Sequence, residues 1–448
     1  MKTAIENGTV VNREGRCRAN VVMEDGRIAY VGPSRVPADR VLDAAGCYVM
    51  AGFIDPHTHL ELSPHPFGPD TEAALLGGTT CVLEFANQQA GRPMAEALAA
   101  WRAMAAGSAC HYGIHMSVPW WDEGQAAQLA EMAAAGVTSF KMYMVYNGLR
   151  VDDGAIYCAA KAAAAAGGLL SVHCENWDVL QRRTEELARA GVLGPEGHPR
   201  SRPAPVEAEA VGRFLRIAQL AGAPAYVVHL SCRESLEEVR RARARGQEVY
   251  VETCPQYLLL DERRYGEAQG ARYVMSPPLR EPADCEALWQ ALARGEIDTV
   301  GTDHCSFSLA EKLAHSDDFR QIPNGCAGLQ HRAQLLYTYG VAAGRLTLEQ
   351  MAACLSANPA ELFGLGDRGA VRPGMAADLV VWEPGWEGVL TDNNHRHDCD
   401  HSIYAGFRVR GRAREVFLDG APVVERGALC RTGGGRYLPR RPAGRYRR

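Results

Sequence analysis

The stretch that decides the fold is residues 48–59, which read Tyr48-Val49-Met50-Ala51-Gly52-Phe53-Ile54-Asp55-Pro56-His57-Thr58-His59. Apolar residues dominate its first seven positions, which is typical of a buried β-strand. The stretch ends in two histidines separated by one residue. Because residues i and i+2 of a strand point to the same face, both imidazoles are expected to leave one side of one strand. His57 and His59 are therefore expected to lie close enough to share a metal ion.

Seven more short apolar runs follow this stretch. Counting the first, the runs are residues 48–55, 79–85, 112–118, 137–144, 169–173, 225–229, 249–253 and 299–302. Longer alanine-rich or charge-rich amphipathic segments separate them, for example residues 95–106 and 206–221. Eight strands that alternate with helices predict the α/β class and a (β/α)8 TIM-like barrel. A doubly wound open sheet is the runner-up, but no glycine-rich phosphate turn follows the first strand.

Both ends of the chain carry a different, all-β pattern. Short strand-like runs separated by turns fill the first 45 or so residues, and Asp25-Gly26 is typical of a hairpin turn. The β pattern returns after residue 371. Neither end is long enough to bury a core of its own, so we expect the two to pair into one β-sandwich beside the barrel. The predicted division is residues 1–48 and 371–448 for the sandwich, with an oligomer-contacting tail, and 49–370 for the catalytic barrel.

Composition excludes several classes of partner. The chain has 448 residues, 47% of them hydrophobic, and a formal net charge of −5, which argues against nucleic acid or an anionic membrane. It shows no leader-like apolar region and no membrane-length apolar stretch, and its 14 cysteines include no C-x-x-C pair. We expect a cytoplasmic protein with reduced thiols. The basic residues 440–448 are expected to form a solvated or subunit-contacting tail rather than a nucleic-acid site.

Candidate metal ligands lie where several predicted strands end, as the chemistry of a barrel requires. They are His57, His59, Lys141, His173, His229 and Asp303. One histidine at the end of a strand is more often structural than a ligand, but four at the same end of one barrel, with an aspartate, favour a metal centre. Imidazole and carboxylate suit zinc and similar divalent ions. The histidine-rich residues 395–401 lie in a polar loop outside the barrel and are not expected to bind metal.

Lys141 lies in the apolar run Phe140-Lys141-Met142, where a charged ammonium is costly to bury. The side chain could reach solvent or pair with an acid. Alternatively, its neutral amine adds CO2 and becomes a carbamate, N6-carboxylysine. The two oxygens of a carbamate can bridge two divalent ions.

These residues, with several motifs, resemble the cyclic amidohydrolases and most closely their dihydropyrimidinase/hydantoinase branch. The motifs are Gly52 to His59, Lys141 with Tyr146, His173-Cys174-Glu175-Asn176, His229-Leu230-Ser231, Glu252 to Tyr257, Ser276 to Arg280, Thr302 to Cys305 and Ile322 to Gly325. The resemblance covers nearly the whole chain. It implies a binuclear centre of divalent ions, commonly zinc, a flanking β-sandwich and a homotetramer.

The resemblance also implies a role for each matching residue. The more buried ion would be held by His57, His59, carboxylated Lys141 and Asp303. The more exposed ion would be held by Lys141, His173 and His229. Tyr146 would donate to the oxyanion, and Ser276 and Asn324 would bind the ring's amide groups through backbone atoms. A bridging hydroxide would attack the ring carbonyl. Asp303 would act as general base and acid. The products of 5,6-dihydropyrimidines or hydantoins would be N-carbamoyl amino acids.

Other activities are less favoured or stay open. Dihydroorotases typically carry an arginine shortly after the HxH pair, whereas this chain has Leu60-Glu61-Leu62. Allantoinase shares the metal ligands and stays an alternative. Residues 65–69, Trp120-Trp121 and Tyr143 could line an apolar substrate pocket, and for Trp120 and Trp121 packing at the barrel rim stays an equal alternative. A non-catalytic scaffold or signalling relative is disfavoured, because this chain keeps all six ligands. The natural substrate, its stereochemistry and the native metal stay open.

Overall fold

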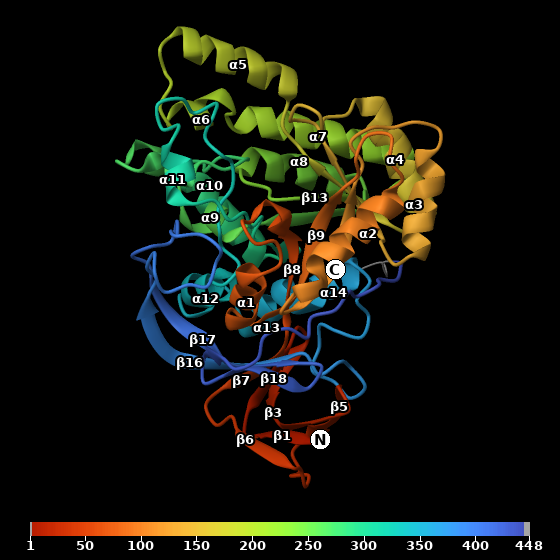
Figure 1. The fold of residues 1–448 in the computed structure, drawn as a ribbon, viewed down its shortest axis with the longest axis vertical. Coiled ribbons are helices and arrows are strands. Elements are labelled where there is room, and N and C mark those ends of the chain that lie inside the picture. The colour runs from red at the N-terminus through yellow and green to blue at the C-terminus, as the bar shows by residue number, and fades with distance from the viewer. Residues whose placement is uncertain (1, 443–448) are drawn as a thin grey trace.

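The computed structural model describes residues 2–442 and is built around an eight-stranded parallel barrel (Figure 1). Its strands are β8 (Phe53–Thr58), β9 (Thr79–Asn87), β10 (His111–Ser117), β11 (Ser139–Tyr143), β12 (Leu169–His173), β13 (Ala225–Val227), β14 (Val249–Thr253) and β15 (Thr299–Val300). They lie in sequence order from β8 to β15. Backbone hydrogen bonds from Asp303 N to His57 O (3.0 Å) and from His59 N to His304 O (2.9 Å) join the two ends. The predicted barrel is confirmed.

Helices alternate with the barrel strands and pack on their outer side (Figure 1). They are α1 (Pro69–Leu76), α2 (Met94–Met104), α3 (Gln125–Ala134), α4 (Asp153–Ala165), α5 (Trp177–Arg189), α6 (Gly197–Ser201), α7 (Ala204–Ala221), α8 (Arg233–Ala244), α9 (Pro255–Leu259), α10 (Pro282–Ala293), α11 (Leu309–Leu313), α12 (Arg332–Leu336), α13 (Leu348–Ala352) and α14 (Asn358–Leu362). Apolar residues of both layers form one large core, which fixes the strand ends that carry the candidate ligands.

The run at residues 48–55, predicted as the first barrel strand, is two strands in the structure. β7 (Tyr48–Ala51) belongs to a different sheet, and only β8 enters the barrel. The chain switches sheets at Gly52, where a Cβ atom would lie 2.1 Å from Thr80 Oγ1. Apolarity alone did not reveal the switch, because the strands on both sides of Gly52 are buried.

Both ends of the chain build two further sheets, which lie below the barrel in Figure 1. The first has the order β19-β18-β17-β16-β7-β2-β3 and the second β5-β4-β1-β6. The strands are β1 (Thr3–Glu6), β2 (Thr9–Asn12), β3 (Gly15–Arg18), β4 (Asn20–Glu24), β5 (Arg27–Gly32), β6 (Arg40–Asp43), β16 (Leu379–Val389), β17 (Arg408–Leu418), β18 (Ala421–Glu425) and β19 (Ala428–Leu429). Buried Ile5, Val21, Val49, Leu379 and Phe417 share one core. The predicted joining of the two ends is confirmed.

The C-terminal arm returns to the N-terminal end of the barrel. Leu438 N donates to Tyr112 O and Arg440 N to Gly136 O, each at 2.8 Å. Residues 440–448 were expected to form a solvated or subunit-contacting tail, but Arg440 is only 3% exposed and donates to Ser139 Oγ at 2.7 Å and to the Ile114 carbonyl. These hydrogen bonds give the buried guanidinium polar partners inside the protein. Residues 443–448 of the predicted tail lie outside the described residues.

Within residues 2–442, no helix is both long and apolar enough to cross a membrane.

Candidate active site

The structure brings all nine predicted site residues to one cavity of about 230 Å³ at the C-terminal end of the barrel. They are His57, His59, Lys141, Tyr146, His173, His229, Ser276, Asp303 and Asn324. Glu61, Tyr143 and Cys305 also line the cavity, whereas Trp120 and Trp121 do not. Of the residues proposed to form an apolar lining, only Tyr143 therefore does so. These residues belong to different strands and loops, and their predicted convergence is observed.

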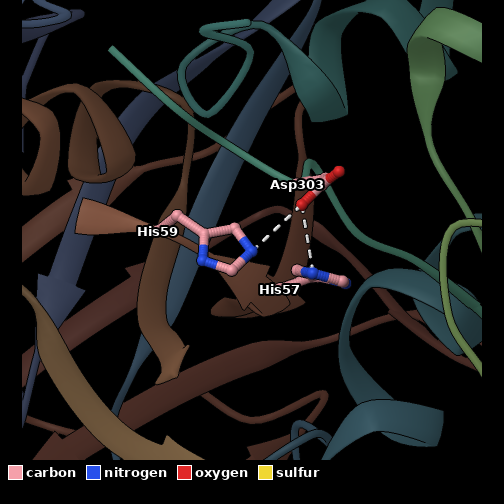
Figure 2. Close-up of side chains that lie close together, drawn as sticks. All are labelled: His57, His59 and Asp303. Atoms are coloured by element: carbon pink, nitrogen blue, oxygen red, sulfur yellow. Dashed lines mark ion pairs between the residues drawn. The ribbon is translucent and has the colours of Figure 1, made fainter. Parts of the chain in front are cut away.

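His57, His59 and Asp303 form the tightest part of the site (Figure 2). Asp303 Oδ1 lies 3.1 Å from His57 Nε2 and 3.3 Å from His59 Nε2. The three ligand atoms all lie within 4.8 Å of one another. Burial opposes ionisation of Asp303, but the two imidazoles keep the pKa of its carboxyl well below the usual range. Within residues 2–442, the buried Nε2 atom of His57 has no hydrogen bond of acceptable geometry, and a metal ion would give it a partner.

A buried carboxylate orients His57 from behind. Glu252 Oε1 lies 2.6 Å from His57 Nδ1 and accepts from the backbone N–H of His229 at 3.2 Å. The other oxygen of Glu252 accepts from Tyr226 Oη at 2.8 Å. A carboxylate in this position selects the tautomer that leaves Nε2 free for a metal ion. Glu252 begins the motif Glu252 to Tyr257, but no role was predicted for it from the sequence.

His173 and His229 face each other, with ring centroids 4.5 Å apart. Glu175 Oε2 lies 2.8 Å from His173 Nε2, which leaves Nδ1 for a ligand. Burial is the main cause that holds the pKa of His229 well below its ordinary value, and the nearby His173 and Lys141 lower it further. A neutral imidazole is the form that binds metal.

Lys141 is 1% exposed, and no carboxylate oxygen of the described residues lies within 4.0 Å of its Nζ atom. The alternatives of solvent contact and acid pairing are therefore not observed. Nζ lies 5.1 Å from the Phe85 ring and 5.3 Å from the Tyr143 ring. Burial lowers the pKa of Lys141 to about 8, which raises the share of neutral amine. A neutral, buried amine next to a metal-ligand cluster fits carbamate formation.

Three site residues that follow barrel strands have a left-handed backbone. The φ angle is +39° at His229, +54° at Asp303 and +78° at Tyr146. A β-strand excludes such angles, so His229 lies outside β13, although it is the last residue of the predicted run 225–229. Conformations of this kind are costly for residues other than glycine and cluster at functional sites.

Ser276 and Asn324 come from two irregular segments that meet across the cavity. Ser276 Oγ donates to Asn324 Oδ1 at 3.0 Å. Among the described residues, none hydrogen-bonds the backbone N–H or C=O of Ser276. These groups are therefore free to meet a ligand in the cavity.

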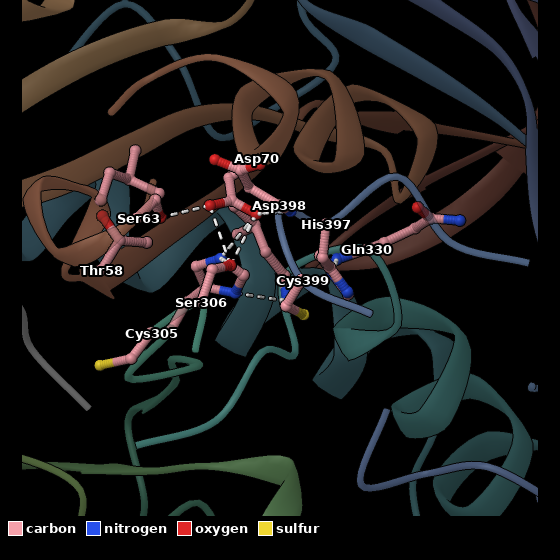
Figure 3. Close-up of polar contacts among 12 residues, drawn as sticks. Thr58, Ser63, Asp70, Cys305, Ser306, Gln330, His397, Asp398 and Cys399 are labelled. Atoms are coloured by element: carbon pink, nitrogen blue, oxygen red, sulfur yellow. Dashed lines mark hydrogen bonds and ion pairs between the residues drawn. The ribbon is translucent and has the colours of Figure 1, made fainter. Parts of the chain in front are cut away.

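A buried polar network supports the loop that carries Asp303 (Figure 3). His304 Nδ1 accepts from Gly328 N at 3.1 Å, and His304 Nε2 lies 3.0 Å from Asp70 Oδ1. Asp70 also accepts from Ser63 Oγ at 2.5 Å and from Ser306 Oγ at 3.0 Å. The histidine-rich loop joins this network, because Asp398 N donates to Asp70 Oδ1 at 2.9 Å. His397 of that loop is buried and accepts from Gln330 N at 2.9 Å. The histidine-rich loop thus supports, from outside the barrel, the loop that carries Asp303.

Comparison with known proteins agrees with this geometry. A model of the amidohydrolase family matches residues 48–421. The chain belongs to this family. D-hydantoinase of Ralstonia pickettii is 38% identical over 454 residues, covering 98% of this amidohydrolase and 99% of the relative. D-phenylhydantoinase of Escherichia coli O9:H4 (strain HS) is 37% identical, covering 99% of each chain. The crystal structure of dihydropyrimidinase from Brevibacillus agri superposes with a TM-score of 0.97 at 35% identity over all of both chains. The resemblance to the dihydropyrimidinase/hydantoinase branch is confirmed.

Proposed function

We propose that this amidohydrolase opens the ring of 5,6-dihydropyrimidines, hydantoins or both. Water adds to a ring carbonyl, the C–N bond breaks, and the nitrogen takes up a proton, which gives an N-carbamoyl amino acid. The observation that carries the proposal is the meeting of all nine residues at one cavity of about 230 Å³. The similarity to hydantoinases and to a dihydropyrimidinase supports the choice of substrate.

The donor set fits two divalent metal ions, for which we propose zinc. His57, His59, Lys141 and Asp303 would hold the more buried ion, and Lys141, His173 and His229 the more exposed one. Two observations support this assignment. The Nε2 atom of His57 has no hydrogen-bond partner among the described residues, and His229 is neutral. Lys141 belongs to both ligand sets, and it would hold both ions only as a carbamate. When bound, such ions lower the pKa of a water and polarise the substrate carbonyl.

The side chains of this chain would perform the proton transfers. Asp303, ionised and close to both imidazoles, takes the proton of the attacking water and passes it to the leaving ring nitrogen. Tyr146 lines the cavity beside His173, with ring centroids 5.0 Å apart. Burial raises the pKa of its hydroxyl far above neutral pH, so Tyr146 keeps its proton and donates a hydrogen bond to the developing oxyanion. Backbone atoms of Ser276 and Asn324 hold the ring's amide groups.

The alternatives are weaker. The relatives named above act on hydantoins or dihydropyrimidines, which does not favour allantoinase. Glu61 lines the cavity and would repel the carboxylate of dihydroorotate. A scaffold relative would not need the complete ligand set. We further propose a cytoplasmic homotetramer, with domains divided at residues 48 and 370.

The test is steady-state hydrolysis of dihydrouracil, hydantoin, 5-phenylhydantoin, allantoin and dihydroorotate, with metal measured on the same sample. Turnover of the first three with about two ions per chain is expected. Turnover of allantoin alone would keep the mechanism and replace the substrate. An inactive protein without metal would support the scaffold alternative.

A further inference from the structure

The segment that carries Ser276 is held by buried side chains instead of strand pairing. Four donors from separate parts of the chain reach four successive residues: Lys312 Nζ to Val274 O (2.7 Å), His198 Nε2 to Met275 O (2.8 Å), Arg202 Nη1 to Ser276 Oγ (2.7 Å) and Tyr257 Oη to Pro277 O (2.8 Å). Irregular backbone inside a protein needs such partners. The position of Ser276 therefore depends on side chains that do not line the cavity themselves.

Lys312 is the donor that also reaches the second segment. Its Nζ atom donates to Pro323 O at 2.6 Å, one residue before Asn324. Gly325 N donates to Val274 O at 3.1 Å, so the two segments also touch directly. Lys312 thus joins the backbone on both sides of the Ser276–Asn324 contact. Helix α11 carries Lys312, and a Ser308–Glu311 capping box fixes the start of that helix.

The burial of Lys312 is unusual for a lysine. The residue is 0% exposed, and no carboxylate oxygen of the described residues lies within 4.0 Å of Nζ. Besides the two carbonyls, the amine has the face of Phe307, whose ring centroid is 5.5 Å away. Burial lowers the pKa of Lys312 to about 8. Both the charged and the neutral amine carry enough N–H groups to serve two carbonyls. The two hydrogen bonds are therefore available across the neutral pH range.

We infer that Lys312 is a positioning residue that sets the spacing between the backbone groups of Ser276 and Asn324. This inference rests on the proposed function, in which those groups hold the amide edge of the substrate ring. The amide edge is common to dihydrouracil, hydantoin and 5-substituted hydantoins. Loss of the spacing should therefore weaken binding of all three by the same factor. A residue that contacts only the ring substituent would instead change the ratio between them.

The experiment compares Lys312→Met with wild type. We expect KM for dihydrouracil, hydantoin and 5-phenylhydantoin to rise by a common factor of about ten or more, since hydrogen bonds to a charged group are lost and the spacing relaxes. Metal content should stay at the wild-type value, because Lys312 touches no ligand. Lys161→Met, which removes an exposed lysine of α4, is the matched control and should leave KM unchanged.

A folded Lys312→Met protein with wild-type KM would overturn the inference. If Lys312→Met does not fold, Lys312→Gln decides, because its carboxamide keeps an N–H donor but cannot serve both carbonyls with the same reach. The expected result is the same common rise in KM, of smaller size. Loss of folding in both variants would show that Lys312 serves stability alone and would also overturn the inference. Wild-type protein that turns over no ring substrate would contradict the proposed function before any variant is compared.

Discussion

Two groups of histidine and aspartate, each with at least one buried member, lie at opposite ends of the barrel. Among residues 2–442, His57–His59–Asp303 and His111–Asp378–Asp419 are the groups of three whose ligand atoms all lie within 4.8 Å. Each contains a buried imidazole Nε2 atom that has no hydrogen bond of acceptable geometry in the described part of the chain. By residue type and spacing alone, both look like metal sites.

Their surroundings differ in charge. Arg368 Nε lies 2.7 Å from Asp378 Oδ2, and Arg436 Nε lies 3.0 Å from Asp419 Oδ2. Arg436 also donates its backbone N–H to His111 Nδ1 at 3.2 Å. Two guanidinium groups therefore neutralise the two carboxylates. No lysine or arginine nitrogen of the described residues lies within 4.0 Å of Asp303. The absence of a fixed cation therefore distinguishes a candidate metal centre from a structural ion-pair cluster.

The largest effect is expected for Lys141→Ala, which removes the ligand proposed to be shared by both ions. Metal content should fall and activity should drop by about 10³-fold or more, because several kcal/mol of transition-state stabilisation are lost. Metal analysis and steady-state rates on one sample measure both effects. Formate or acetate should restore part of the activity, and Lys161→Ala should behave as wild type. Unchanged metal content would contradict the proposed bridging role of Lys141.

The second-largest effect is expected at the group His111–Asp378–Asp419. Arg368→Met should lower the free energy of unfolding by about 3–5 kcal/mol, because Asp378 is left buried without its cation. Denaturant titration measures the loss. Metal content should not change, since the ion pairs at this end of the barrel replace a metal ion. Arg372→Met, at an exposed position, is the control and should change stability little. More than two metal ions per chain in the wild-type protein would show that the two groups are alike after all.

Tyr146→Phe tests the proposed oxyanion donor at the end of the barrel that carries His57, His59 and Asp303. The rate should fall by about 10²-fold, since one donor to the oxyanion is removed, while metal content stays intact. Tyr143→Phe removes a second hydroxyl from a tyrosine of the same cavity and is the matched control, with a smaller expected change. If both variants keep the wild-type rate, neither hydroxyl takes part in catalysis.

The smallest effect concerns pH. Metal-stripped protein should regain activity with zinc and CO2 faster as pH rises, because only the neutral amine of Lys141 forms a carbamate. Burial lowers its pKa to about 8, so the neutral share should grow roughly tenfold between pH 7 and pH 9 and then level off. Initial reactivation rates at constant dissolved CO2 measure this. A rate that keeps rising to pH 10.5 would indicate an ordinary lysine.

Much of the candidate site could be predicted from the sequence. His57 and His59 share one strand face by the geometry of β-structure, and His173, His229 and Asp303 follow apolar runs. A parallel barrel brings such positions together at one end. The residues that support the ligands were not predicted. Glu252 and Arg202 act through contacts between segments far apart in the chain, which periodicity does not report.

By itself, the sequence determined the barrel, the joining of the two ends of the chain and the identity of the candidate ligands, because these follow from local periodicity and from residue chemistry. Only the tertiary structure decided which charges meet. It placed arginines beside Asp378 and Asp419 but none of the described arginines beside Asp303, and it placed Lys312 behind the segments of Ser276 and Asn324. The physical reason is that electrostatic partners and burial depend on distances between segments, and these distances exist only after the chain has folded.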